Sequence, residues 1–152
     1  MTLESGAIAP ALDLDTDAGT RTELADRVSV VYFYPKDDTS GCTKEAIEFT
    51  ALAPDFASAH VQVIGVSKDS LVAHAKFRKK YALDVLLAAD PDGIACEAWG
   101  VWVEKSMYGR KYMGIERATF LVGRDGRIVR AWHKVKVPGH AAEVLAAARA
   151  LV

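Results

Sequence analysis

The stretch VSVVYFY, residues 28–34, decides the fold because it is a nearly continuous run of apolar, β-branched and aromatic residues. Such a run is typical of a β-strand that is buried on both faces of a sheet. Pro35 ends the run, and a polar loop, PKDDTSG, follows it up to Gly41. A buried strand that leads through a polar loop into a helix predicts an α/β layer fold.

A helix is predicted directly after this loop, because four small or apolar residues recur there at helical spacing. They are Cys42, Ala46, Phe49 and Ala53. Pro54 should end or kink this helix near Ala53. The helix therefore begins close to Cys42 and turns one face, which includes Cys42, toward the core.

The remaining elements alternate in the same way. Further strands are predicted over residues 61–66, 85–89, 116–122 and 128–132, and further helices over residues 70–81, 93–100 and 138–151. Asp125-Gly126 between two apolar runs is a strong hairpin signal for the last two strands. The order predicts one thioredoxin-like domain over residues 1–152, with a central mixed β-sheet flanked by helices. An N-terminal β-hairpin extension is expected over residues 11–25, and the pattern alone also leaves open another small α/β sandwich.

Composition excludes several functional classes. The chain has 152 residues and a formal net charge of −1, which gives no electrostatic footprint for nucleic acid or an anionic membrane. No apolar run approaches the ~20 residues of a membrane span, and residues 1–10 lack the pattern of a secretory signal, so we expect a cytoplasmic protein. The two cysteines form no CxxC pair, and the four histidines have no metal-binding spacing. We therefore expect neither a metal nor another cofactor.

Cys42 is the residue that chemistry singles out. A lone cysteine is often just a small buried hydrophobe, but the start of a helix favours a thiolate by ~0.3–1 kcal/mol through its N–H groups and dipole. Reactive thiols need a larger effect, because their pKa values of roughly 3.5–7.5 lie well below the ~8.5 of a free thiol. The neighbouring carboxylates act in the wrong direction, so the sequence requires a cation near Cys42, best supplied by the fixed fork of an arginine.

The loop and helix start also carry a family resemblance. Residues 35–42, PKDDTSGC, have the form P-x-x-x-T-x-x-C and resemble the active-site signature of the peroxiredoxins. The longer string YPKDDTSGCTKEA, residues 34–46, resembles the bacterioferritin comigratory protein, or peroxiredoxin Q, subfamily. ERATFLV, residues 116–122, is similar to the strand that bears the subfamily's active-site arginine. The resemblance runs in the same order over essentially the whole chain.

This resemblance implies a role for each matched residue. Cys42 would be the peroxidatic cysteine, and Arg117 would stabilise its thiolate and bind the peroxide. Thr39 would hydrogen-bond the thiolate and the substrate oxygen, and Pro35 would shield the pocket from water. Glu45, one turn into the helix, would orient Arg117. The implied enzyme is a thiol-dependent peroxidase that reduces hydrogen peroxide and organic hydroperoxides through a sulfenic acid, with thioredoxin or another thiol as reductant.

The chain departs from its relatives in how the cysteine would be regenerated. Many members of the subfamily carry a resolving cysteine five positions after the peroxidatic one, where this chain has Ile47, and others carry it in the helix over residues 70–81, which has none. The leading interpretation is a one-cysteine mechanism in a monomer. The alternative is a Cys42–Cys96 disulfide, which would require local unfolding because bridged Cα atoms lie within about 7 Å.

Two rival functions remain open at this point. A thioredoxin-fold disulfide oxidoreductase would need CxxC, but the fourth residue of the segment that starts at Cys42 is Glu45. A non-catalytic binding module would not need the combination of residues described above.

A cluster of large side chains lies in the second half of the chain, and we expect it to be core. If part of the cluster lines the pocket mouth, organic hydroperoxides would be favoured as substrates. It comprises Trp99, Trp102, Tyr108, Tyr112 and Met113.

Overall fold

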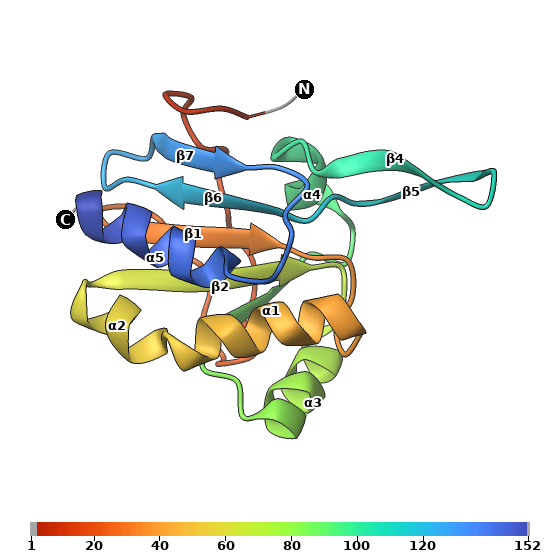
Figure 1. Ribbon diagram of the computed structural model, residues 1–152, viewed down its shortest axis with the longest axis horizontal. Helices are drawn as coiled ribbons and strands as arrows, with labels where there is room; N and C mark the ends of the chain where they lie inside the picture. The colour runs from red at the N-terminus through yellow and green to blue at the C-terminus, as the bar shows by residue number, and fades with distance from the viewer. Residues whose placement is uncertain (1–2, 152) are drawn as a thin grey trace.

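The structure, a computed structural model, describes residues 3–151 (Figure 1). The strands are β1 (Val28–Phe33), β2 (Val61–Ser67), β3 (Leu86–Ala89), β4 (Trp102–Met107), β5 (Arg110–Ile115), β6 (Ala118–Val122) and β7 (Ile128–Trp132). The helices are α1 (Ser40–Ala51), α2 (Ala53–Ser58), α3 (Leu71–Tyr81), α4 (Ile94–Ala98) and α5 (His140–Leu151).

Strand β1 lies at the centre of a five-stranded sheet with the order β3-β2-β1-β6-β7. β1, β2 and β3 are parallel, whereas β6 runs antiparallel to β1 and β7 antiparallel to β6. All six residues of β1 are buried. The predicted mixed sheet is therefore confirmed, and the strand predicted to be buried on both faces is the central one.

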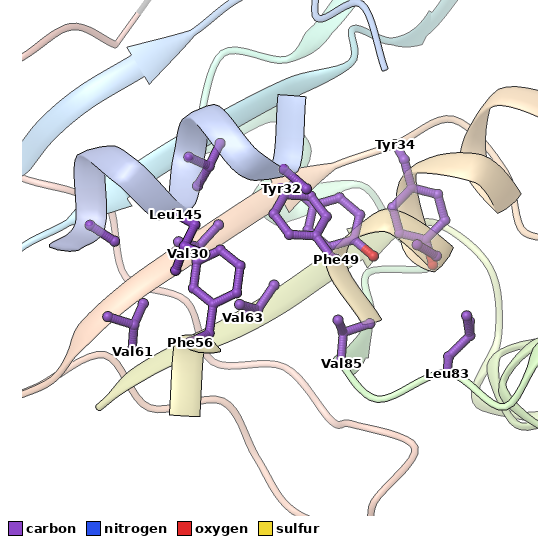
Figure 2. Packing of buried hydrophobic residues seen from close by; sticks show 14 of the residues in the cluster. Val30, Tyr32, Tyr34, Phe49, Phe56, Val61, Val63, Leu83, Val85 and Leu145 are labelled. Carbon is purple, nitrogen blue, oxygen red and sulfur yellow. The ribbon is translucent and has the colours of Figure 1, made fainter. Parts of the chain in front are cut away.

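The side chains of β1 alternate between two apolar cores, one on each face of the sheet. Val30 and Tyr32 point into the first core, where they meet Phe49 of α1, Phe56 of α2 and Leu145 of α5 (Figure 2). The second core contains the other set of β1 side chains together with α4 and the N-terminal segment. Each large side chain that is fully buried in this way contributes about 1.5–3 kcal/mol.

Pro54 acts as the sequence predicted, because α1 ends at Ala51 and a separate short helix, α2, starts at Ala53 with the proline in its first turn. The first three residues of the predicted apolar face are buried, but Ala53 is only half-buried because it belongs to α2. The N-terminal hairpin is present as the isolated bridge Asp15↔Arg21 rather than as continuous strands, and the bridge Thr16↔Ala88 joins it to β3. Its turn lies against the edge strand β3, where an Asp17 N–H donates to the Leu87 carbonyl oxygen at 3.0 Å.

The β4–β5 hairpin was not predicted, and it projects from the rest of the molecule (Figure 1). Its two-residue turn, Tyr108-Gly109, has positive φ at both positions, as the tight turns that match strand twist require. The expectation that the large side chains of this region form core is wrong for the hairpin. Trp99 is fully buried, but Tyr108 is 98% exposed and Tyr112 and Met113 are about half exposed. Their backbone pairs only with the other hairpin strand, so no second layer covers both faces.

Within residues 3–151, no helix has the length and the apolar character that crossing a bilayer requires.

The first core predicts an unusual effect for Tyr32→Phe. The Tyr32 hydroxyl is buried and has no hydrogen-bond partner among the described residues, so its removal should raise the free energy of unfolding by about 1 kcal/mol. Urea unfolding measures this. Tyr34→Phe is the matched control and should lower stability, because the Tyr34 hydroxyl donates to Asp37 Oδ1 at 2.6 Å. A destabilised Tyr32→Phe variant would contradict the prediction.

Candidate active site

Cys42 is the third residue of α1, directly after the loop that leaves β1. Thr39 is the N-cap residue with an extended backbone, and the first hydrogen bond of the helix runs from the Thr43 N–H to the Thr39 carbonyl oxygen at 2.8 Å. The amides of Gly41 and Cys42 precede this bond, and the first N–H groups of a helix point out of its end toward any anion there. Cys42 as a whole residue is only 2% exposed.

Arg117 reaches Cys42 because β6 pairs with β1. Ala118, the first residue of β6, lies opposite Phe33 at the end of β1, so the preceding Arg117 lies where α1 begins. Its Nη2 atom donates to Cys42 Sγ at 3.4 Å, and its Nη1 atom donates to Glu45 Oε1 at 2.7 Å. The sequence required a cation beside Cys42, and the structure provides it 75 positions along the chain.

Gly41 makes room for this guanidinium. A Cβ atom at position 41 would lie 3.0 Å from Arg117 Nη2, closer than ordinary carbon contacts. A side chain here would require the guanidinium to shift by a few tenths of an ångström. Gly41, the second residue of α1, therefore lets Arg117 approach Cys42 without this shift.

Glu45 holds the other edge of the guanidinium in a nearly dry environment. Its side chain is 1% exposed, and Oε2 has no hydrogen-bond partner among the described residues. Burial raises the pKa of Glu45 to about 7, although the charge of Arg117 acts in the opposite direction. For Arg117, burial lowers the pKa, but the Glu45 carboxylate and the Cys42 sulfur raise it overall, so the guanidinium stays charged.

Thr39 and Pro35 lie beside this group but do not contact the sulfur. Both residues are exposed, and the Thr39 hydroxyl donates to the Lys36 carbonyl oxygen at 2.8 Å. The hydrogen bond from Thr39 to the thiolate that the resemblance implied is thus not made in this structure. The structure brings Cys42, Arg117 and Glu45 together and leaves Thr39 and Pro35 at the rim.

A cavity of about 430 Å³ opens next to Pro35, between the loop and the β4–β5 hairpin. It is lined by Pro35, Lys36, Lys68, Asp69, Trp102, Lys105, Tyr112, Met113, Gly114 and Ile115. Burial, followed by the nearby charge of Arg117, lowers the pKa of Lys105, whereas the charge of Cys42 acts in the opposite direction. Lys105 therefore lies close to the site, and sequence reasoning missed it because the hairpin that carries it was not predicted.

Cys96 lies in a different environment from Cys42. It belongs to α4 in the second core, whereas Cys42 belongs to the first core, so the central sheet separates the two thiols. Cys96 is completely buried, and its N–H donates to Asp90 Oδ2 at 2.9 Å. Burial and then the Asp90 carboxylate raise the pKa of the Cys96 thiol, which opposes a reactive thiolate.

The chemical capacity of the site follows from these contacts. A sulfur nucleophile lies between a fixed cation and helix amides, which suits attack on a substrate that expels an anionic oxygen. Among residues 3–151, no three histidine, cysteine, aspartate or glutamate side chains are grouped so that they could hold a metal ion.

Comparisons with known proteins agree with this chemistry. Residues 5–131 match the AhpC/TSA family. The chain is 48% identical over 148 residues to a putative peroxiredoxin bcp of Coxiella burnetii, with 95% of this chain and 98% of that protein covered. It is 46% identical over 148 residues to peroxiredoxin Bcp of Bacillus subtilis, with 95% and 94% covered. A structure of Xanthomonas campestris peroxiredoxin Q superimposes with a TM-score of 0.88 at 46% identity, covering 97% of this chain and 96% of that one.

The raised pKa of Glu45 predicts a pH-dependent stability. A carboxyl group with a folded-state pKa of about 7 instead of 4.5 favours folding in its protonated form, so this contribution is lost as the pH rises from 4.5 to 7. Glu45→Gln does not titrate, so between about pH 5 and about pH 8 its free energy of unfolding should gain about 1–3 kcal/mol relative to the natural protein. Urea unfolding at the two pH values measures the change. Glu23→Gln, at an exposed position, is the control, and an equal change in both variants would refute the assignment.

Proposed function

Because the chain belongs to the AhpC/TSA family of thiol-dependent peroxidases, we propose that Cys42 is the nucleophile that attacks the peroxide. The observation that carries this assignment is the hydrogen bond from Arg117 Nη2 to Cys42 Sγ at 3.4 Å. A charged guanidinium beside the sulfur favours the thiolate, which is the reactive form of a cysteine. The family predicted from the sequence resemblance is confirmed, and the roles of the individual residues are our proposal.

The first half-reaction transfers one oxygen atom to sulfur. The Cys42 thiolate attacks the terminal oxygen of a hydroperoxide, a bond from sulfur to oxygen forms, and the O–O bond breaks. The electron pair of that bond leaves on the second oxygen, which takes a proton and departs as water or an alcohol. Arg117 and the amides at the start of α1 stabilise the negative charge on this oxygen.

Three neighbouring residues support the first half-reaction in different ways. Glu45 holds Arg117 through the 2.7 Å hydrogen bond and so acts as a positioning residue. Thr39 has a hydroxyl that can rotate away from the Lys36 carbonyl oxygen and donate to a peroxide oxygen next to Cys42. Pro35 forms the rim where the substrate enters.

The second half-reaction uses an external thiol in a one-cysteine cycle. This is supported by the sheet that lies between Cys42 and Cys96 and by the complete burial of Cys96. A disulfide between them would need Cα atoms within about 7 Å, which the separate cores do not allow without unfolding. Thioredoxin or another thiol reductant is the reductant we propose, acting on a cytoplasmic monomer.

The cavity beside Pro35 supports organic hydroperoxides as substrates together with hydrogen peroxide. Its lining includes apolar side chains from both hairpin strands, among them Trp102 and Met113, and these can contact an alkyl or aryl group whose peroxide end lies at Cys42. Alkyl peroxide reduction is the activity ascribed to a relative of known structure, the bacterioferritin comigratory protein of Xanthomonas campestris. Part of the large-residue cluster would thus line the pocket mouth.

The one-cysteine cycle predicts opposite behaviour for the two cysteine variants. Cys42→Ser should abolish peroxide consumption in an assay with thioredoxin, its reductase and NADPH, whereas Cys96→Ala should keep the rate within about twofold because Cys96 touches no reacting group. Consumption that survives Cys42→Ser would sink the assignment of the nucleophile.

Mass spectrometry after one equivalent of peroxide checks the same cycle. The natural protein should gain one oxygen, or form an adduct when a small thiol is added. A loss of two hydrogens together with a Cys42–Cys96 crosslink would instead establish the two-cysteine alternative.

The cavity predicts selective damage by Met113→Ser. Loss of this half-exposed apolar contact should lower kcat/KM for cumene hydroperoxide by roughly fivefold, the equivalent of about 1 kcal/mol, and leave hydrogen peroxide unaffected. Met107→Ser, on the same hairpin but outside the cavity lining, is the matched control. An equal loss for both peroxides would show that Met113 does not select the substrate.

A further inference from the structure

A buried polar network lies next to the peroxidatic site and takes no part in the chemistry described above. Its centre is the pair His74 and Asp37, whose Nδ1 and Oδ2 atoms are 2.7 Å apart. The Tyr34 hydroxyl donates to Asp37 Oδ1 at 2.6 Å, and the Asp37 N–H donates to Asp69 Oδ2 at 2.9 Å. The His74 side chain is fully buried and that of Asp37 almost so.

The partners of His74 fix its protonation state. Its Nε2 atom lies 3.0 Å from the Ala88 carbonyl oxygen, which can only accept, so Nε2 carries a proton. Its Nδ1 atom faces the Asp37 carboxylate, which also accepts in its charged form and already receives the Tyr34 hydroxyl. Both ring nitrogens are therefore donors, and His74 is an imidazolium paired with a carboxylate.

This pair connects α3 to the loop that leads into the nucleophile. His74 belongs to α3, and Asp37 lies in the loop over residues 34–39, which connects β1 to α1. A second connection, exposed to solvent, runs to Asp38 from Lys80 Nζ at 2.8 Å and from the Tyr81 hydroxyl at 2.7 Å. The loop that presents the start of α1 is thus held by α3 at two consecutive residues.

We propose that His74 is a positioning residue for the peroxidase reaction: as an imidazolium it holds Asp37, and through Asp37 the loop over residues 34–39, in the geometry that presents Cys42 to the peroxide. The inference rests on the proposed function of Cys42. When His74 loses its Nδ1 proton to solvent, a nitrogen lone pair faces the carboxylate, the hydrogen bond is lost, and the buried connection between the loop and α3 is weakened. We call the His74–Asp37 pair the latch. The latch is closed while His74 is protonated and opens at high pH.

The direction of this pH dependence follows from the groups around the ring. Asp37 and Asp69 face it with negative charge, the Ala88 carbonyl accepts from it, and the Tyr34 ring packs beside it. Burial lowers the pKa of His74, but Asp37, then the Ala88 carbonyl and Asp69, outweigh it and raise the pKa above 6.5. The latch is closed below this raised pKa, and its contribution to stability and to positioning is lost as the pH rises through it.

The decisive experiment compares pH profiles of kcat/KM for hydrogen peroxide. In the natural protein the value should fall on the alkaline side. In His74→Gln, whose amide can donate to Asp37 but cannot titrate, the alkaline fall should disappear and the plateau should lie about tenfold lower. His60→Asn is the matched control, because His60 is exposed and asparagine tolerates its left-handed backbone, and it should keep the natural profile.

Two further measurements separate this cause from others. Lys105 is a second group that could titrate near the site, so Lys105→Gln should keep an alkaline fall if His74 causes it. NMR of the imidazole nitrogens in the natural protein should show both protonated at neutral pH, and this test does not depend on whether the variant folds.

Three outcomes would overturn the proposal: a neutral His74 ring at neutral pH, an alkaline fall that persists in His74→Gln, or one that vanishes in Lys105→Gln. Each differs from a failure of the proposed function, in which Cys42→Ser would still consume peroxide.

Discussion

One guanidinium group joins the start of β6 to α1, because Arg117, the residue before β6, donates both to Glu45 and to Cys42 of α1. The contact depends on the pairing of β6 with β1 in the register that places Ala118 opposite Phe33. A shift of one residue would turn every side chain of β6 to the other face of the sheet and would carry Arg117 away from the helix. Both faces of β1 and β6 are buried, so the fit of individual side chains into the two cores sets this register. The packing of the core thus fixes the position of the cation.

The charge balance of the site depends on Glu45 as well. A fully ionised carboxylate would offset much of the guanidinium charge, but burial raises the pKa of Glu45 to about 7. Near neutral pH a large part of the Glu45 population is therefore protonated, and its carbonyl oxygen can still accept from Arg117. The arginine is held in place while its positive charge remains directed to the sulfur of Cys42.

Much of the fold and the centre of the site could be predicted from the sequence. The run over residues 28–34 predicted the buried central strand, and helical spacing with Pro54 predicted the helix that begins near Cys42 and its end. A stabilising cation was required on energetic grounds, and only the resemblance identified it as Arg117. Contacts that depend on loop conformation could not be foreseen. The Thr39 hydroxyl bonds a carbonyl in its own loop, and no periodic pattern reveals a partner of that kind.

The β4–β5 hairpin escaped prediction for a different physical reason. Its aromatic and sulfur-containing side chains have the composition of core residues, but the hairpin pairs only with itself and leaves one or both faces uncovered. The buried pair of Asp37 and His74 was also missed, because the two residues lie 37 positions apart on elements whose packing is decided by the sheet. Spacing along the chain carries no signal for such a meeting.

The sheet that separates the two thiols has a consequence for how the enzyme is inactivated during turnover. On the proposed one-cysteine cycle, Cys96 stays behind the sheet and does not capture the Cys42 sulfenic acid, so the lifetime of the sulfenic acid is set by the concentration of the outside thiol. A second peroxide molecule competes for the same sulfur and converts it to sulfinic acid, which ordinary thiols do not reverse. On the proposed cycle, the fraction of enzyme lost per turnover is therefore the ratio of two bimolecular rates. That ratio rises with the peroxide concentration and falls with the reductant concentration. The number of turnovers before inactivation therefore depends on the balance between the two concentrations.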